Sequence, residues 1–215
     1  MFIIPGLYLI KPYSGSNIYA ISDKDGIYII DTGFEGNDEL IFGMIDAFFG
    51  AEPEDIVGII LTHGHPDHVG SLPEIIDISG ADVYIHEKDL PLLEKYTGLK
   101  DIPNLITLKG GEVLNVLGGL KVIHAPGHTD GSIMLYKEGE ILFTGDVLLT
   151  DKDGEIKLPL HKYTKDMKKE IASMLKIKAF DFHILLPGHG PPILERAKER
   201  YLLFLEKFRR LGRLI

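Results

Sequence analysis

Thr62-His63-Gly64-His65-Pro66-Asp67-His68 is the stretch that decides the fold, and it holds three imidazoles and a carboxylate within six residues. In an extended or loosely turned segment alternate side chains point the same way, which predicts that His63, His65 and Asp67 share one side with His68 beside them. Imidazole nitrogen and carboxylate oxygen are the donors that borderline divalent ions such as zinc prefer. A lone histidine is usually an ordinary surface or core residue, but this cluster predicts a metal site.

The flanking residues predict where this cluster lies in the fold. Residues 55–61, Asp-Ile-Val-Gly-Ile-Ile-Leu, form a short apolar run of branched side chains, which is typical of a buried strand. After the cluster, Ser71 and Glu74 have the spacing of a helix-capping box. We therefore expect the cluster in a loop at the end of a strand, where open α/β sheets tend to carry their active sites.

Composition narrows the classes of function. A chain of 215 residues with 45% hydrophobic and 26% charged side chains is expected to fold as one globular domain, 1–215. The net charge of -9 argues against a nucleic-acid partner, which needs a basic face. The chain has no cysteine, so any metal has to be held by histidine and carboxylate.

Targeting signals are also missing from the sequence. Residues 1–6 lack the basic region and long apolar core of a signal peptide, and no apolar run reaches membrane-spanning length. We therefore expect a cytoplasmic protein with no membrane partner. Glutamine and cysteine are absent and asparagine is scarce, which hints at a thermophilic source.

Further predicted strands also end in loops that carry histidine or aspartate. Glycine in such loops lets the backbone approach a bound ion or substrate closely. The loops that follow the strands at 120–124, 141–143 and 183–186 present His128, Asp146 and His189. Asp31, after the run 26–30, is either a turn residue or an acceptor for the ring N–H of a metal-bound histidine.

These motifs resemble the metallo-β-lactamase superfamily in kind and in order. The matching stretches are Asp31-Thr32-Gly33, residues 62–70, Pro126-Gly127-His128-Thr129, Phe143-Thr144-Gly145-Asp146 and residues 186–190. The resemblance spans about Gly6 to Pro192 and implies a four-layer αβ/βα sandwich of the α/β (α+β) class. Two β-rich halves closed by helices agree with such a sandwich.

The resemblance implies a metal centre of two divalent ions per chain, zinc first, with iron or manganese as alternatives. His63, His65 and His128 are implied as ligands of one ion, Asp67, His68 and His189 of the other, and Asp146 as the bridge. Two ions can share a hydroxide that attacks a carbonyl, and Asp67 is the implied catalytic residue that orients it and moves a proton. The expected reaction is hydrolysis of an ester, thioester or lactone bond in a small-molecule substrate.

Within the superfamily, His68 resembles the glyoxalase II-like and lactonase-like branches. The lack of cysteine and of a signal peptide argues against an antibiotic-hydrolysing role. Glyoxalase II binds glutathione through a helical extension, whereas one helix, at 192–211, is predicted after Gly190. We therefore expect a glyoxalase II-like hydrolase with an unknown acyl donor.

Two later segments allow more than one interpretation. Residues 148–164 directly follow Asp146, so His161 and Tyr163 are candidate substrate contacts, or the segment is an ordinary loop before a helix capped by Thr164. Residues 195–213 have apolar positions at helical spacing, which usually means packing on the domain's own sheet. A membrane-surface or dimer role is the alternative.

Two other functional classes stay open. Persulfide dioxygenases of the same superfamily use a single iron held by residues similar to His63, His128 and Asp146. A non-catalytic binding protein is disfavoured because every expected ligand is present. The sequence leaves open the substrate, the metal and whether the chain forms a homo-oligomer.

Overall fold

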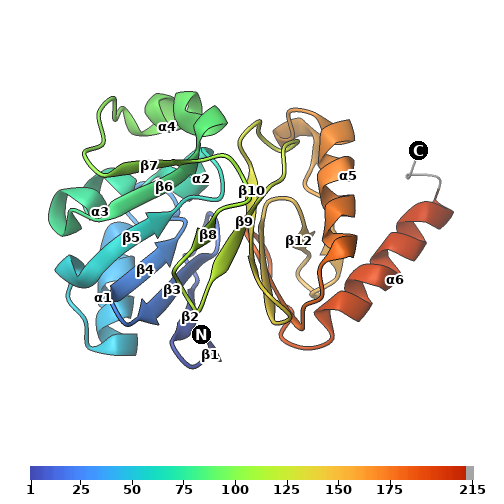
Figure 1. The fold of residues 1–215 in the computed structure, drawn as a ribbon, viewed down its shortest axis with the longest axis horizontal. Coiled ribbons are helices and arrows are strands. Elements are labelled where there is room, and N and C mark those ends of the chain that lie inside the picture. The colour runs from blue at the N-terminus through green and yellow to red at the C-terminus, as the bar shows by residue number, and fades with distance from the viewer. Residues whose placement is uncertain (212–215) are drawn as a thin grey trace. The chain divides into compact units, whose positions relative to one another are not determined.

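The computed structural model describes residues 1–211 and divides the chain into two compact units. Unit 1 is Met1–Gly110, and unit 2 begins at Gly111. Each unit is built on one main β-sheet with helices (Figure 1). Among the described residues, no helix is both long and apolar enough to span a membrane.

Unit 1 contains a seven-stranded sheet in which the strands follow chain order. Strands β1 to β4 pair antiparallel, and β4 to β7 pair parallel. Because β4, β5 and β6 are parallel neighbours, the residues that follow each of them lie at one edge of the sheet. The strands are β1 Phe2–Ile4, β2 Leu7–Ile10, β3 Ile18–Asp23, β4 Gly26–Ile30, β5 Ile56–Ile60, β6 Asp82–His86 and β7 Leu105–Leu108.

The helices of unit 1 bury their apolar stripes in one cluster with the sheet. Ile41 and Ile45 of α1 and Leu72 and Ile75 of α3 are fully buried there with isoleucines of β4 and β5. This is the arrangement expected of a sheet that needs an apolar cover. The helical segments are α1 Asp38–Phe49, η1 Pro53–Asp55, α2 Pro66–Val69, α3 Leu72–Ser79, η2 Glu87–Asp89 and α4 Leu90–Thr97.

Unit 2 contains a five-stranded sheet of order β14-β11-β10-β9-β8 and a small hairpin, β12-β13. Strand β14 pairs parallel to β11, while β10 is antiparallel to both β9 and β11. Strands β9, β11 and β14 therefore run in the same direction, and their carboxyl ends lie at one edge. The strands are β8 Val113–Leu114, β9 Leu120–His124, β10 Ile133–Lys137, β11 Ile141–Gly145, β12 Leu149–Thr150, β13 Ile156–Lys157 and β14 Ile184–Pro187.

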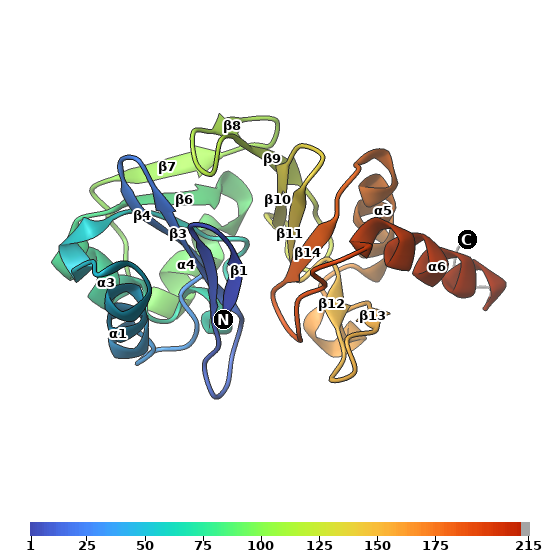
Figure 2. The same ribbon diagram turned by 90° about the horizontal axis from the view of Figure 1, so that it is seen from below.

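Two longer helices complete unit 2 (Figure 2), α5 at Met167–Lys176 and α6 at Ala197–Arg210, together with the short helices η3 His161–Tyr163 and η4 Ile177–Ala179. Met174 of α5 and Tyr201 of α6 are fully buried in a cluster with Met134 and Leu142 of the sheet. The Tyr201 hydroxyl donates to the Met174 carbonyl oxygen at 2.9 Å, which satisfies a polar group that would be costly to bury alone.

Several local predictions need correction. Residues 66–69 form the short helix α2, so the alternation of side chains expected of an extended or loosely turned segment ends at His65 and does not reach Asp67. Ser71 does not cap α3, because its hydroxyl donates to the Phe34 carbonyl. Thr164 does not cap α5; the Asp166 carboxylate accepts from the N–H groups of residues 168 and 169 instead.

The last helix is shorter than the sequence indicated. Helix α6 covers Ala197–Arg210, whereas Ile193 pairs with Leu185 in an isolated antiparallel bridge. The predicted packing of its apolar side on unit 2 is confirmed by the burial of Tyr201, Leu205 and Phe208. Arg213, the end of the predicted helical stretch, lies outside the described residues.

Candidate metal centre

In unit 1, the metal-ligand candidates follow β5, between polar residues that follow the two neighbouring strands. Asp31 comes directly after β4, and Asp89 comes three residues after β6. The Asp89 carboxylate accepts from the Gly64 N–H at 2.8 Å, which fixes the loop between His63 and His65. Sequence reasoning missed Asp89, although its place after the next parallel strand was a usable signal. We call His63, His65, Asp67 and His68 the unit 1 cluster.

Asp31 organises the base of the unit 1 cluster. Its backbone has φ 59, in the left-handed region that aspartate tolerates better than most residues. One carboxylate oxygen accepts from the Thr62 N–H at 2.8 Å, and the other contacts the Thr62 hydroxyl and His68 Nδ1, both at 2.8 Å. A carboxylate there favours a proton on Nδ1 of His68, so that Nε2 is the ring atom presented to a metal. Of the two roles open for Asp31, this contact with His68 favours that of an acceptor, while the positive φ also agrees with a turn residue.

The donor atoms of the unit 1 cluster fall into two pairs. His63 Nε2 and His65 Nδ1 lie 3.1 Å apart, and His68 Nε2 lies 3.8 Å from Asp67 Oδ2. The Thr62 hydroxyl donates to Asp31 and lies 3.2 Å from His63 Nδ1, which favours a proton on that nitrogen and leaves Nε2 as the ligand atom.

Asp31→Asn should weaken metal binding by about 10- to 100-fold, as is typical when a carboxylate behind a metal-binding histidine is lost. Asparagine also tolerates the left-handed backbone, so the fold should persist. Metal affinity is measured by competition with a chelator, and exposed Asp25→Asn serves as the control. Unchanged affinity in Asp31→Asn would remove the role assigned to this carboxylate.

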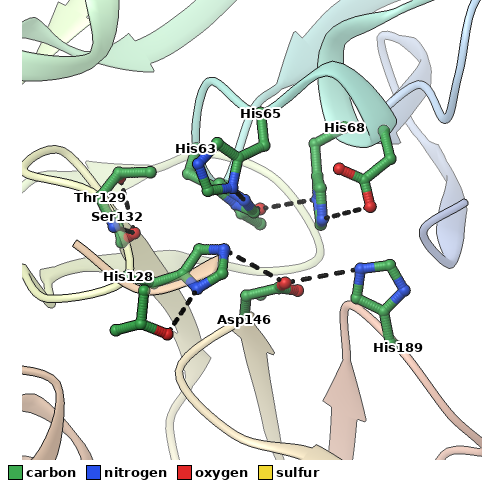
Figure 3. A network of polar contacts seen from close by, with 12 residues as sticks. His63, His65, His68, His128, Thr129, Ser132, Asp146 and His189 are labelled. Atoms are coloured by element: carbon green, nitrogen blue, oxygen red, sulfur yellow. Dashed lines mark hydrogen bonds and ion pairs between the residues drawn. The ribbon is translucent and has the colours of Figure 1, made fainter. Parts of the chain in front are cut away.

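In unit 2, three candidate ligands follow the ends of β9, β11 and β14. His128 Nε2 lies 3.4 Å from Asp146 Oδ2, and His189 Nε2 lies 3.5 Å from the same oxygen. Figure 3 shows His128 and His189 pointing at Asp146 from two sides. We call His128, Asp146 and His189 the unit 2 cluster.

Neighbouring groups hold the unit 2 cluster in place. The Thr164 hydroxyl donates to the Leu160 carbonyl and lies 3.5 Å from His128 Nδ1, which leaves Nε2 to face Asp146. The Gly188 backbone packs directly against the carboxylate, since a Cβ at position 188 would lie 2.2 Å from Asp146 Oδ1. Sequence reasoning missed the Thr164 contact, because Thr164 was assigned to a helix cap, whereas a close approach of backbone was expected in the glycine-bearing loop that contains Gly188.

The spacing of these donors fits metal ligation. Adjacent ligands of a tetrahedral zinc ion, with bonds of about 2.0–2.1 Å, lie roughly 3.3 Å apart. The pairs within the two units measure 3.1, 3.4 and 3.5 Å, and the Asp67–His68 pair 3.8 Å. Nitrogen and carboxylate oxygen are also the donor types that zinc, iron and manganese accept. Both clusters are therefore suitable for divalent metals.

Glu170 of α5 is a buried acid beside the unit 2 cluster. Burial raises the pKa of its carboxyl to about 8; the nearby His128 backbone opposes this rise, and the charge of Asp146 adds to it. The Gly127 backbone lies so close that a Cβ there would be 2.3 Å from the Glu170 nitrogen. Sequence reasoning missed Glu170, which looks like an ordinary helical glutamate.

Glu170→Gln should remove part of the pH dependence of stability. The folded pKa of about 8 lies above the ordinary 4.5, so this group's contribution is full below pH 4.5 and is lost as the pH rises to about 8. Glutamine keeps the shape without the charge. Melting temperatures between pH 5 and 8.5 should thus fall less in Glu170→Gln than in the parent or in the exposed control Glu138→Gln. Parallel curves for all three proteins would contradict this.

Comparison with known proteins now places the chain. The family model for the metallo-β-lactamase superfamily matches residues 13–189. The chain belongs to this superfamily. The fold class predicted from the sequence is also confirmed. Both main sheets contain parallel and antiparallel strand pairs, and the similar solved structures have the metallo-β-lactamase fold.

Individual metallo-β-lactamase relatives agree with this assignment. The chain is 28% identical to "Probable metallo-hydrolase YflN" of Bacillus subtilis (strain 168), over 83% of this chain and 81% of that protein. It is 33% identical to metallo-beta-lactamase domain-containing protein 1 of Xenopus laevis, over 66% of this chain and 58% of that protein. A metallo-beta-lactamase family protein of Thermus thermophilus, TTHA1429, matches with a TM-score of 0.73 and 26% identity, over 98% and 82% of the two chains. These similarities support an enzyme of the metallo-hydrolase class.

The remaining histidines of this superfamily member lie outside both clusters. His86 is buried and its Nε2 lies 3.2 Å from the Lys109 carbonyl oxygen, while His124 Nε2 lies 2.9 Å from the Asp130 carbonyl oxygen. His161 lines a groove beside α6, and Tyr163 is exposed under the Lys162 ammonium group. A substrate contact by His161 or Tyr163 stays a prediction.

Proposed function

We propose that this chain is a dinuclear metal-dependent hydrolase of the glyoxalase II-like branch, with zinc as the first candidate metal and iron or manganese as alternatives. In this proposal His63, His65 and His128 hold one ion. Asp67, His68 and His189 hold the other, and Asp146 bridges the two. The reaction is cleavage of an ester, thioester or lactone bond in a small metabolite.

The geometry around Asp146 carries this proposal. A single carboxylate oxygen faces His128 and His189, which the proposal assigns to different ions. A shared carboxylate needs this placement. The unit 1 cluster supports the same assignment, because His63 pairs with His65 and Asp67 pairs with His68.

The chemistry divides between the metals and the chain's own residues. When bound, the two ions would supply a water of lowered pKa and a Lewis acid for the scissile carbonyl. Asp67 would orient the attacking water and accept its proton, since its carboxylate is 22% exposed at the edge of the cluster. Asp31 would keep His68 in the required tautomer from behind.

A mononuclear iron dioxygenase is the competing function. It would need ligands similar to His63, His128 and Asp146 only. The Asp67–His68 pair favours a second ion, because it offers two donors that a site built from His63, His128 and Asp146 alone would leave unused. Elemental analysis of purified protein separates the two: about two ions per chain support the hydrolase, and a single iron supports the dioxygenase.

A substrate panel tests the bond type. The metal-loaded protein is assayed with a small thioester, an aryl ester, a lactone and a phosphodiester. We expect turnover of the acyl substrates and none of the phosphodiester. Absence of acyl hydrolysis in a protein that contains two metals would overturn the proposed reaction while leaving the metal assignment intact.

Glutathione recognition is expected to be poor. The helix described after the last proposed ligand, α6, buries Tyr201, Leu205 and Phe208 in the core of unit 2, so this side of the helix serves packing. S-lactoylglutathione should therefore gain little in kcat/KM over a small thioester of similar reactivity, because the remote peptide part adds no binding energy. An advantage above about 100-fold, or roughly 2.7 kcal/mol, would show a glutathione site.

A further inference from the structure

Unit 2 contains a large apolar groove beside α6. It has a volume of about 1040 Å³ and is bounded by residues 151–161, by the start of α5 and by the outer part of α6. Most of its wall is aliphatic or aromatic, as in Leu158, Leu160, Ile171, Leu203, Phe204 and Phe208. We call this the α6 groove. None of the metal-ligand candidates lines it.

Hydrogen bonds fix each wall of the α6 groove. Arg200 donates to the Gly154 carbonyl at 2.7 Å, and the Tyr201 hydroxyl donates to the Met174 carbonyl at 2.9 Å, which ties α6 to the hairpin and to α5. The wall at 151–161 is held at both ends. Before it, the Thr150 N–H donates to the His189 carbonyl oxygen at 3.1 Å, and after it, the Thr164 hydroxyl contacts His128. A site with fixed walls loses little entropy when a ligand binds.

The shape of the α6 groove favours a slender apolar ligand. Ligand pockets are concave, mostly apolar, and about 300–1000 Å³ in volume, which this groove matches. The wall on α6 extends from Arg200 to Leu211, roughly 16 Å at 1.5 Å per residue. Leu203 is 66% exposed and Leu160 is 61% exposed, so a ligand in the groove would remove apolar surface from water.

The charges of the α6 groove favour an anionic end group. Lys157, Arg200 and Lys207 line it against two carboxylates, although the chain carries a net charge of -9. Arg200 already pairs with Glu155 at 3.3 Å, and the Asp151 carboxylate accepts two backbone N–H groups. Lys207 has no carboxylate partner within residues 1–211 and is available to a ligand.

We propose that the α6 groove binds a monomeric long-chain fatty acid, with the alkyl chain along Leu203 and Phe204 and the carboxylate at Lys207. This site is separate from the hydrolytic chemistry and needs no metal. A protein that binds fatty acids but hydrolyses nothing would support this inference and refute only the proposed reaction.

The test is a binding titration on the full chain as purified. Octanoate, dodecanoate and hexadecanoate, each below its aggregation limit, displace a fluorescent fatty acid. Affinity should rise with chain length by up to about fourfold per buried methylene, until the groove is full. Dodecanoate should bind at least fivefold more tightly than dodecanol, and dodecyltrimethylammonium should bind more weakly than either.

Matched variants locate the site. Leu160→Gln/Leu203→Gln should lower dodecanoate affinity at least tenfold, whereas Leu202→Gln, at an exposed neighbour outside the groove, should change it less than twofold. Lys207→Glu should lower dodecanoate affinity at least fivefold with little effect on dodecanol. Arg209→Glu, at the exposed residue two positions on, is its charge-matched control.

Four outcomes would overturn the inference. The first is no binding of any chain length, and the second is equal loss in the groove variants and their controls. The third is binding only to vesicles of anionic lipid, which would indicate a membrane surface. The fourth is dimeric protein whose groove variants become monomeric in sedimentation, which would indicate a second copy of the chain.

Discussion

Asp146→Ala is expected to abolish hydrolysis and to lower the metal content from about two ions per chain to one or fewer. Its Oδ2 atom lies near both His128 and His189, at 3.4 and 3.5 Å, so its loss removes a contact to each of them. In the proposed dinuclear centre, loss of the bridging carboxylate would remove a bond from each ion and leave their positive charges less compensated. The effect on kcat/KM should reach about 10³-fold or more, comparable to the loss of an essential catalytic group.

The measurement combines elemental analysis with kinetics on the same preparation. Asp153→Ala, an exposed aspartate of the turn after β12, is the control and should keep metal and activity. Because Asp146 is 7% exposed, circular dichroism has to show that the variant is folded. Full metal and full activity in folded Asp146→Ala would rule out the bridging role.

Asp67→Asn should lower kcat by about 10²- to 10⁴-fold and change KM only a few-fold. Asparagine has nearly the same size but cannot accept a proton from the attacking water. Its amide also presents N–H donors where the carboxylate presented only acceptor oxygens, 3.8 Å from His68 Nε2. An interaction made in the transition state affects kcat, whereas one made equally in the bound substrate affects KM.

Steady-state kinetics of Asp67→Asn are compared with those of Glu74→Gln, an exposed acid on the following helix α3. The control should match the parent. A rise in KM at unchanged kcat in Asp67→Asn would indicate a role in substrate binding and would exclude Asp67 as the catalytic base.

Much of the site could be predicted because metal chemistry restricts the residue types. Histidine and aspartate directly after apolar strands were visible in the sequence, and strand direction brings the ends of β4, β5 and β6 together. The same rule brings His128, Asp146 and His189 together in unit 2. Residues that are far apart in the sequence thus come together because of the sheet topology, which the apolar runs and the family resemblance both indicated.

The helix caps were not predicted correctly, because they depend on contacts that short polar side chains make with distant parts of the chain. Ser71 and Thr164 looked like helix caps, yet the Ser71 hydroxyl donates to the Phe34 carbonyl and Thr164 faces His128. Hydroxyl and amide groups can bond to any nearby backbone group, so tertiary neighbours override their local preference. The burial of Glu170 was equally invisible, because it arises from the close approach of Gly127 to α5.

Gly188 has no side chain that could take part in the chemistry. The packing around it should nevertheless exclude substitutions as strictly as at a residue that binds metal. Even alanine would place a carbon 2.2 Å from the Asp146 carboxylate and 3.0 Å from the Gly145 carbonyl. Gly43 in α1 has open space instead, so alanine should be tolerated there and even favoured by helix propensity. Saturation mutagenesis should thus find Gly188 as intolerant of substitution as the proposed catalytic residues. The intolerant positions would then include residues that only give the site its shape.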